Sequence, residues 1–188
     1  MDQLYTVTLG TNASDTISAP SVAGFIYGFN GSNNITGSNF NDYIVGGDTG
    51  VDTINGGPGN DTIVGLQGND ILTGGSGSDI FLYDNITQLA KIGNDRITDY
   101  SFGSGDVLAF HHVLDVTAPI GTVDIADLVL FTDVVNDGTG HVQINFYGTP
   151  ANGNHGGAAI GSVDLQTVNY TGGSEITNYA LNIQVFAN

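Results

Sequence analysis

A nine-residue repeat runs through the first half of the chain and constrains its fold more than any other feature. From Gly10 to Leu82 the sequence divides into eight consecutive units, and only the unit that begins at Gly46 is longer, by one residue. In each nine-residue unit the eighth place is large and apolar, and the sixth place is usually aspartate; in the longer unit the same residues stand at the ninth and seventh places. A fixed period with one residue suited to burial and one carboxylate indicates a solenoid.

Each unit can be read as one short strand and one turn. The apolar places hold Ile17, Ile26, Ile35, Ile44, Ile54, Ile63, Leu72 and Phe81, and the sixth places hold Asp15, Gly24, Asn33, Asp42, Asp52, Asp61, Asp70 and Asp79. The three residues around each apolar place alternate out, in and out, as in a strand, while the glycine-rich remainder reverses the chain. Two units therefore make one coil, and each unit stacks on the second unit after it.

This stacking brings carboxylates together. Asp42 is expected to face Asp61, Asp61 to face Asp79, and Asp52 to face Asp70. Such bare carboxylates repel each other, and a hard cation between them, with turn carbonyls as further ligands, removes the repulsion. Oxygen-only ligands in a flexible loop suit calcium better than zinc or magnesium.

The best units, GGPGNDTIV and GGSGSDIFL, fit the pattern G-G-x-G-x-D-x-U-x, and GLQGNDILT lacks only its second glycine. These residues resemble the RTX (repeats-in-toxin) family of secreted calcium-binding proteins. The resemblance implies an all-β fold, a right-handed parallel β-roll with several calcium ions held in the turns on both edges. Gly24 and Asn33 replace aspartate in early units, where we expect weaker sites or none.

The resemblance also implies a ligand set, in which each site takes two carboxylates and several turn carbonyls from stacked units. On one edge the two halves are Gly37, Asn39 and Asp42 against Gly57, Gly59 and Asp61, followed by Gly56, Pro58 and Asp61 against Gly75, Gly77 and Asp79. On the opposite edge they are Gly46, Asp48 and Asp52 against Leu66, Gly68 and Asp70. The extra residue in the unit at Gly46 is expected to alter the geometry there.

The segment IGNDRITDYSFGSGDVLAF, residues 92–110, resembles the closing segment of such rolls. It follows a predicted loop from Asp84 to Leu89, and its Asp95, Asp99 and Asp106 match acids that complete the last sites. The predicted domains are a calcium-binding roll over residues 1–110 and a β-rich cap over residues 111–188, the region in which the family carries a type I secretion signal. Candidate strands of the cap are 107–110, 128–135, 141–147, 159–168 and 179–186, with a hairpin turn at Asn136–Gly140 and a helical turn after Thr122.

The composition is strongly acidic, with 19 acids against two basic residues and a formal net charge of −17. Such a surface excludes nucleic acid as a partner, and about four to six bound calcium ions would cancel much of the charge. The sequence shows no cysteine, no apolar run long enough to span a membrane and no Sec-type signal at its start. We therefore expect export of an unfolded chain by the type I apparatus, and folding in extracellular calcium, with affinity near 10⁻⁴–10⁻³ M.

The strand triplets of the even-numbered units carry apolar residues at their outer places, such as Phe25, Tyr27 and Tyr43, whereas those of the odd-numbered units are mostly polar. One sheet should therefore face water, and the other should be covered. We expect residues 107–188 to fold back over the apolar sheet. The alternative is a contact between molecules, in a dimer or a lattice.

No catalytic motif is visible, and the adjacent His111 and His112 would point to opposite faces of a strand. The chain is therefore predicted not to be an enzyme. Its expected function is that of a secreted calcium-binding protein with a structural, surface-layer-like role at the bacterial cell surface. The alternatives are the secretion and folding module of a larger exoenzyme, such as a protease, lipase or alginate epimerase, and an ice- or polysaccharide-binding solenoid.

Overall fold

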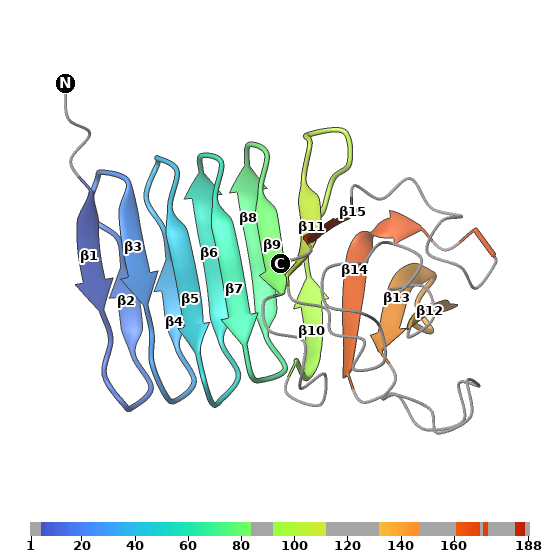
Figure 1. Cartoon of the computed structure of the whole chain (residues 1–188), viewed down its shortest axis with the longest axis horizontal. Coiled ribbons are helices and arrows are strands. Elements are labelled where there is room, and N and C mark those ends of the chain that lie inside the picture. Colours follow the sequence, from blue (N-terminus) through green and yellow to red (C-terminus); the bar gives the residue numbers. More distant parts are fainter. Residues whose placement is uncertain are drawn as a thin grey trace.

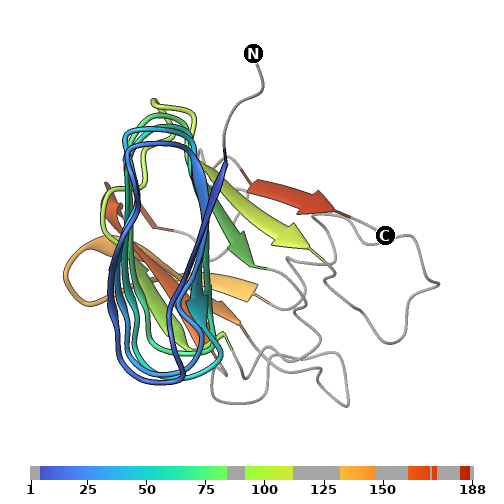
Figure 2. The same ribbon diagram turned by 90° about the vertical axis from the view of Figure 1, so that its left-hand side faces the viewer.

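The computed structural model describes residues 5–83, 92–111, 132–146, 161–169, 171–172 and 183–186, and every structural statement below concerns these ranges. Within them the chain forms strands and no helix, and therefore no helix that could span a membrane. The strands stack side by side along the long axis of the molecule (Figure 1). Viewed along that axis, the coils superimpose as a flattened tube with one sheet on each side (Figure 2).

The repeat units alternate between two sheets, as the period predicts. The first sheet contains β1 (Thr6–Leu9), β3 (Gly24–Tyr27), β5 (Tyr43–Gly47), β7 (Thr62–Leu66), β9 (Ile80–Tyr83), β11 (Val107–His111) and β15 (Ile183–Phe186), all parallel to their neighbours. The second contains β2 (Thr16–Ser18), β4 (Asn34–Thr36), β6 (Thr53–Pro58), β8 (Ile71–Ser76), β10 (Asn94–Ile97), β14 (Gly161–Asn169), β13 (His141–Phe146) and β12 (Thr132–Asn136). In both sheets, each unit pairs with the second unit after it.

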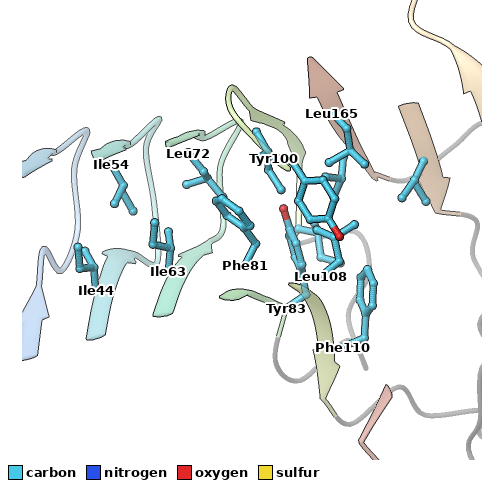
Figure 3. Close-up of a cluster of buried hydrophobic side chains, with 14 of the residues drawn as sticks. Ile44, Ile54, Ile63, Leu72, Phe81, Tyr83, Tyr100, Leu108, Phe110 and Leu165 are labelled. Atoms are coloured by element: carbon cyan, nitrogen blue, oxygen red, sulfur yellow. The ribbon is translucent and has the colours of Figure 1, made fainter. Parts of the chain in front are cut away.

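The core of the roll consists of two columns of apolar side chains, one from each sheet. Ile35, Ile54 and Leu72 stand in register in the second sheet, while Ile44 and Ile63 stand in register in the first. All five are at most 1% exposed. Figure 3 shows this column structure passing into a larger cluster that includes Tyr100, Leu108, Phe110 and Leu165. Each fully buried side chain contributes roughly 1.5–3 kcal/mol by removal from water, so one short triplet per unit suffices to hold the coil closed.

Glycine sets how closely successive turns approach. At Gly57 and Gly75 the backbone has φ of 99° and 105°, which non-glycine residues rarely adopt. A Cβ atom on Gly57 would lie 2.5 Å from the carbonyl oxygen of Ser38 in the preceding coil, and one on Gly75 would meet the carbonyl oxygen of Gly57. The turns can therefore stack at the spacing of the sheets only because these positions carry no side chain.

The C-terminal strands lie near their predicted positions, and β12 and β13 form the predicted hairpin around Asn136–Gly140. Their placement differs from the expectation that residues 107–188 cover the apolar sheet. β11 and β15 continue the first sheet beyond β9, and β14 continues the second beyond β10, so the described strands lengthen the roll at one end. Free backbone groups at the last coil favour this, because strand addition gives them hydrogen-bond partners.

The face of the first sheet is consequently only partly covered in the described structure. Val64 is buried and Val45 is 9% exposed, but Phe25 and Tyr43 stay 38% and 39% exposed. The predicted loop at Asp84–Leu89, the turn after Thr122 and His112 lie outside the described residues, as does the side chain of His111.

Candidate metal-binding edges

The sixth-place residues form a ladder along each edge of the roll. In each step, the backbone N–H of one sixth-place residue donates a hydrogen bond to the side-chain Oδ1 of its counterpart in the next coil. The first ladder comprises Gly24, Asp42, Asp61, Asp79 and Asp106, with N···Oδ1 distances of 2.7, 2.8, 2.9 and 3.0 Å. The second comprises Asp15, Asn33, Asp52, Asp70 and Asp95, with distances of 2.9, 2.7, 2.8 and 2.9 Å. The structure thus places Asp42 beside Asp61, Asp61 beside Asp79, and Asp52 beside Asp70, as the sequence predicts.

The ladder residues are buried, although they are formally charged. Asp52 and Asp70 have no exposed surface, and Asp61, Asp79 and Asp95 are 1% exposed. In these five residues the second carboxylate oxygen, Oδ2, is buried and has no hydrogen-bond partner within the described part of the chain. A buried carboxylate oxygen without a partner is costly, because nothing replaces the water it has lost.

The electrostatics reflect this cost. Burial, and to a smaller extent the neighbouring ladder carboxylates, raises the pKa of Asp61 and Asp70 to about 7 and that of Asp95 to about 8. For Asp52 and Asp79 the pKa rises to about 6, again chiefly through burial. The Oδ1 hydrogen bonds act in the opposite direction but do not offset burial. Each edge therefore holds carboxylates that need either a proton or a cation.

A cradle lies beside four of the unpartnered oxygens, those of Asp52, Asp61, Asp70 and Asp79, at the first-place glycine of the same unit. A Cβ atom on Gly56 would meet Asp61 Oδ2 and lie 2.6 Å from the carbonyl oxygen of Gly74 in the next coil. One on Gly65 would lie 2.5 Å from Asp70 Oδ2. Gly46 has the same relation to Asp52 Oδ2 and to the carbonyl oxygen of Gly65, at 2.8 Å. The missing side chain leaves backbone carbonyl and carboxylate oxygens facing the same small space.

This donor set fits calcium. It contains only carboxylate and carbonyl oxygens, which are the ligands that calcium prefers, in a turn that can adapt its geometry. Within the described residues no three His, Cys, Asp or Glu side chains converge on one point, so backbone carbonyls would supply much of the coordination. The carbonyls of the implied set lie in the right turns: Gly57 pairs with Gly75, and Pro58 with Ser76, across adjacent coils.

Asp42 differs from the other predicted ligands. Its Oδ2 accepts a hydrogen bond of 2.6 Å from the backbone N–H of Ser38, and its Oδ1 accepts one from Gly24. Asp15 is similar, because its Oδ2 accepts hydrogen bonds from the N–H and hydroxyl of Thr11. Within the described residues, neither carboxylate has a buried oxygen without a hydrogen-bond partner. The half-site implied for Gly37, Asn39 and Asp42 is thus satisfied internally in this structure.

The acids of the closing segment divide into two kinds. Asp95 and Asp106 join the two ladders, although 25 and 27 residues separate them from Asp70 and Asp79. Asp99 lies outside both ladders. Its Oδ1 accepts a hydrogen bond from Gly74 and its Oδ2 one from Gly75, at 2.9 and 2.8 Å, so it closes the last turn. The Asp48 side chain is exposed, and only its backbone belongs to the implied site.

A further column of asparagines escaped the sequence analysis. Asn60 N–H donates to Asn41 Oδ1 at 2.9 Å, Ser78 N–H donates to Asn60 Oδ1 at 3.0 Å, and on the other edge Asn94 N–H donates to Asn69 Oδ1 at 2.9 Å. The signal was available, since asparagine recurs at the fifth place directly before the aspartate. These side chains bind the outer backbone of the turns and hold successive coils in register.

A parallel β-roll with an oxygen-lined ladder on each edge is the architecture of a calcium-binding solenoid. The family model of the RTX calcium-binding nonapeptide repeat, four copies long, matches residues 27–49 and 47–81. Residues 27–81 therefore carry RTX calcium-binding nonapeptide repeats.

Among solved structures, the chain is similar to the AlgE6R3 subunit of the mannuronan C5-epimerase of Azotobacter vinelandii, determined in solution. The TM-score is 0.50 at 22% sequence identity, over 93% of this chain and 79% of that one. This similarity supports the β-roll fold. A search of curated proteins finds no match.

Proposed function

We propose that the chain is a secreted, non-catalytic calcium-binding protein whose β-roll folds when extracellular calcium is supplied. The observation that carries the proposal is the set of five buried carboxylates, Asp52, Asp61, Asp70, Asp79 and Asp95, each with an Oδ2 atom that has no hydrogen-bond partner among the described residues. A fold that buries five such oxygens along its two edges needs counter-ions at neutral pH.

Calcium is a better occupant of the cradles than protons. Protonation would neutralise one carboxylate at a time, and its single O–H could be donated to only one of the oxygens around it. A calcium ion can be coordinated by carboxylate and carbonyl oxygens at once, and its two positive charges match those of two stacked carboxylates. Because the unfolded chain has no preformed cradle, the free energy of binding is coupled to folding.

This coupling suggests why such a chain would suit export. In a compartment with little free calcium, repulsion among the ladder acids and the net charge of −17 would disfavour the compact roll. Outside the cell, calcium at millimolar levels would exceed the 10⁻⁴–10⁻³ M range expected of extracellular modules and favour folding. We propose that the C-terminal region carries the type I secretion signal and that the folded protein has a structural role at the cell surface.

A second candidate is a repeat module of a larger exoenzyme. It is favoured by the similarity to the AlgE6R3 subunit, which is part of a mannuronan C5-epimerase. In that setting the roll would serve secretion and folding, with the chemistry performed elsewhere. Determination of the full reading frame and its genomic neighbours separates the two candidates.

The experiment combines calorimetric titration with circular dichroism on the full chain at pH 7.5. We expect strand content to be lost in EGTA and regained on addition of calcium, with several ions bound per chain. Magnesium at the same concentration serves as the control, because it demands stricter octahedral geometry and keeps its water. Equal strand content in EGTA and in calcium would refute the proposal, as would the absence of calcium-dependent heat.

A further inference from the structure

The N-terminal end of the roll exposes a sheet edge. β1 is the last strand of the first sheet, and within the described residues no strand pairs with its outer side. Tyr5, Val7 and Leu9 are 67%, 68% and 57% exposed, which makes this end the most apolar exposed surface in the described structure. At the opposite end, β15 and β14 extend the two sheets beyond the roll (Figure 1).

The backbone of β1 is available for pairing. Thr6 N–H donates to Ala23 O at 3.1 Å, and Gly10 N–H donates to Tyr27 O at 2.8 Å, so the even-numbered residues of this segment bond to β3. In a parallel ladder, alternate residues direct both their N–H and C=O groups to the same side. The amide and carbonyl groups of Tyr5, Val7 and Leu9 therefore point to the open edge, where they can pair with another strand.

The usual protection of an edge strand is missing at β1. The sequence TVTL contains neither a proline nor a charged residue, either of which would discourage pairing. At the same end of the roll, the terminal strand of the second sheet is β2, which has only three residues with Thr16 and Ser18 at its outer places, and Pro20 follows it closely. The open edge of the first sheet is thus the one suited to an additional strand.

The charge distribution indicates which molecule would supply the additional strand. Residues 1–41 contain only Asp2 and Asp15 of the chain's 19 acids, and no lysine, arginine, histidine or glutamate. Two copies of a chain with a charge of −17 repel each other almost everywhere except at this end. We propose that the β1 edge joins two copies of this chain end to end, in a two-fold symmetric dimer.

The pairing that this surface allows is antiparallel, because a two-fold axis through Val7 sets β1 against itself. Tyr5 of each copy then lies opposite Leu9 of the other, and the two Val7 residues face each other. All six side chains stand on one face of a continuous sheet, beside the exposed Phe25. So small an interface gives a weak dimer, with a dissociation constant on the order of 10⁻⁵ M.

The test is sedimentation velocity of the full chain in calcium, from roughly 5 to 500 µM, a range that brackets this constant. The wild-type chain is expected to shift from monomer to dimer across the series. Val7→Lys places like charges at the symmetry axis, and Val7→Pro removes the N–H that faces the open edge without touching a bond to β3. Both variants are expected to stay monomeric at every concentration.

Val51→Lys is the matched control, because Val51 is also an exposed valine, at 46%, but lies in a turn away from β1. It should dimerise like the wild type. Circular dichroism of all samples shows whether the roll is folded, so a failure of calcium-dependent folding is distinguished from a failure of dimerisation. A folded wild-type chain that stays monomeric overturns the inference, as does equal dimerisation of all variants.

The stacked rings of Phe25 and Tyr43, with centroids 5.6 Å apart and planes inclined by 17°, offer a different use of the same face. They could serve as a platform for a sugar ring. A monomeric chain that binds a neutral polysaccharide, and loses that binding in Tyr43→Ala, would replace the dimer with this function.

Discussion

The fourth and seventh repeat units have the same length and carry aspartate at the same place, but the hydrogen bonding of the aspartate carboxylate differs between them. In the fourth unit, GSNFNDYIV, the N–H of Ser38 satisfies Asp42 Oδ2, whereas in the seventh, GLQGNDILT, Asp70 Oδ2 has no partner within the described part of the chain. Neither unit has glycine at the second place. The second glycine of the consensus therefore does not by itself decide whether the carboxylate is left for a cation.

The difference follows the fourth place of the unit. Gly68 has φ of 159°, and Leu66, two residues earlier, takes the left-handed conformation at 72° despite its side chain. The fourth unit has Phe40 at this place, and Ser38 is not left-handed. A left-handed leucine costs roughly 1–2 kcal/mol, so the turn must impose it. We infer that glycine at place four sets the turn that directs the place-two N–H away from the carboxylate.

Other units agree with this rule. In the sixth and eighth units the glycines at places two and four all have positive φ: Gly57, Gly59, Gly75 and Gly77. In both units the carboxylate, of Asp61 or Asp79, has an Oδ2 without a partner in the described structure. The first unit has alanine at place four, and there Thr11 satisfies Asp15, as Ser38 does Asp42. In the first and fourth units the turn thus satisfies the second oxygen of the aspartate, and we call this a closed turn. In the sixth to eighth units the turn leaves that oxygen available to a cation, and we call this an open turn.

The largest expected effect comes from filling a cradle. Gly65→Ala places a methyl group against Asp70 Oδ2, where a calcium ion would otherwise bind. We expect loss of at least one ion per chain and a midpoint for calcium-induced folding shifted upward by about tenfold, equivalent to about 1.4 kcal/mol. Titration calorimetry and circular dichroism measure both.

Gly103→Ala is the control for that variant. Gly103 is exposed, and a Cβ atom there would be 3.7 Å from Ser101 Oγ, an ordinary contact. This variant should bind calcium and fold like the wild type. If Gly65→Ala also behaved like the wild type, the first-place glycine would not border a metal site.

Substitution of asparagine for aspartate at two ladder positions tests the difference between open and closed turns. Asn33 shows that the amide fits at place six, since its Oδ1 accepts the N–H of Asp15. Asp70→Asn removes a buried charge with an unpartnered oxygen, so it should weaken calcium binding several-fold yet make the roll more stable in EGTA. Asp42→Asn should change calcium affinity much less, because both oxygens of Asp42 already accept hydrogen bonds. Equal losses of calcium binding in the two variants would contradict the distinction.

The pH dependence follows from the raised pKa values of the ladder. Because burial raises the pKa of Asp61 and Asp70 from 3.8 to about 7, the folded roll without calcium holds more protons than the unfolded chain between those values. Its stability should therefore fall as the pH rises from about 4 to about 7, with Asp95 extending the fall to about 8. Circular dichroism of the chain in EGTA across this range checks the sign, because the folded fraction should be highest near pH 4 and should fall toward pH 8. A roll without calcium that gains stability as the pH rises would show that these carboxylates are not buried as described.

The smallest effect is expected from opening a closed turn. The double variant Ser38→Gly, Phe40→Gly gives the fourth unit the glycines that the sixth and eighth units have. It should free Asp42 Oδ2 and strengthen calcium binding on that edge by a few-fold, offset in part by the entropy of the added glycines. Unchanged affinity would mean that place four does not control the carboxylate.

The roll itself was predictable, because one apolar place per unit leaves a single way to bury a column such as Ile35, Ile54 and Leu72. The partners of Asp42, Asp61 and Asp70 also followed from the period alone. Whether their Oδ2 atoms accept a hydrogen bond could not be predicted from the period. It depends on the backbone conformations of Ser38 and Leu66, and the RTX pattern treats both residues simply as departures from glycine.

Beyond residue 110 no period exists, so strand positions could be predicted from alternation but their place in the sheets could not. The strands β11 and β14 extend the sheets, because the free edge of the last coil offers hydrogen bonds that the apolar face cannot. The asparagine column at Asn41, Asn60 and Asn69 was visible in the repeat, yet a neutral side chain gave no reason to single it out.

The most direct measurement is a crystal structure grown in ample calcium, with an anomalous difference map recorded near the calcium edge. The account predicts peaks in the late coils, next to Oδ2 of Asp61, Asp70 and Asp79, and a weaker peak or none at Asp42 Oδ2. Anomalous density that is absent beside all of the late aspartates, with water alone in the cradles, would contradict it.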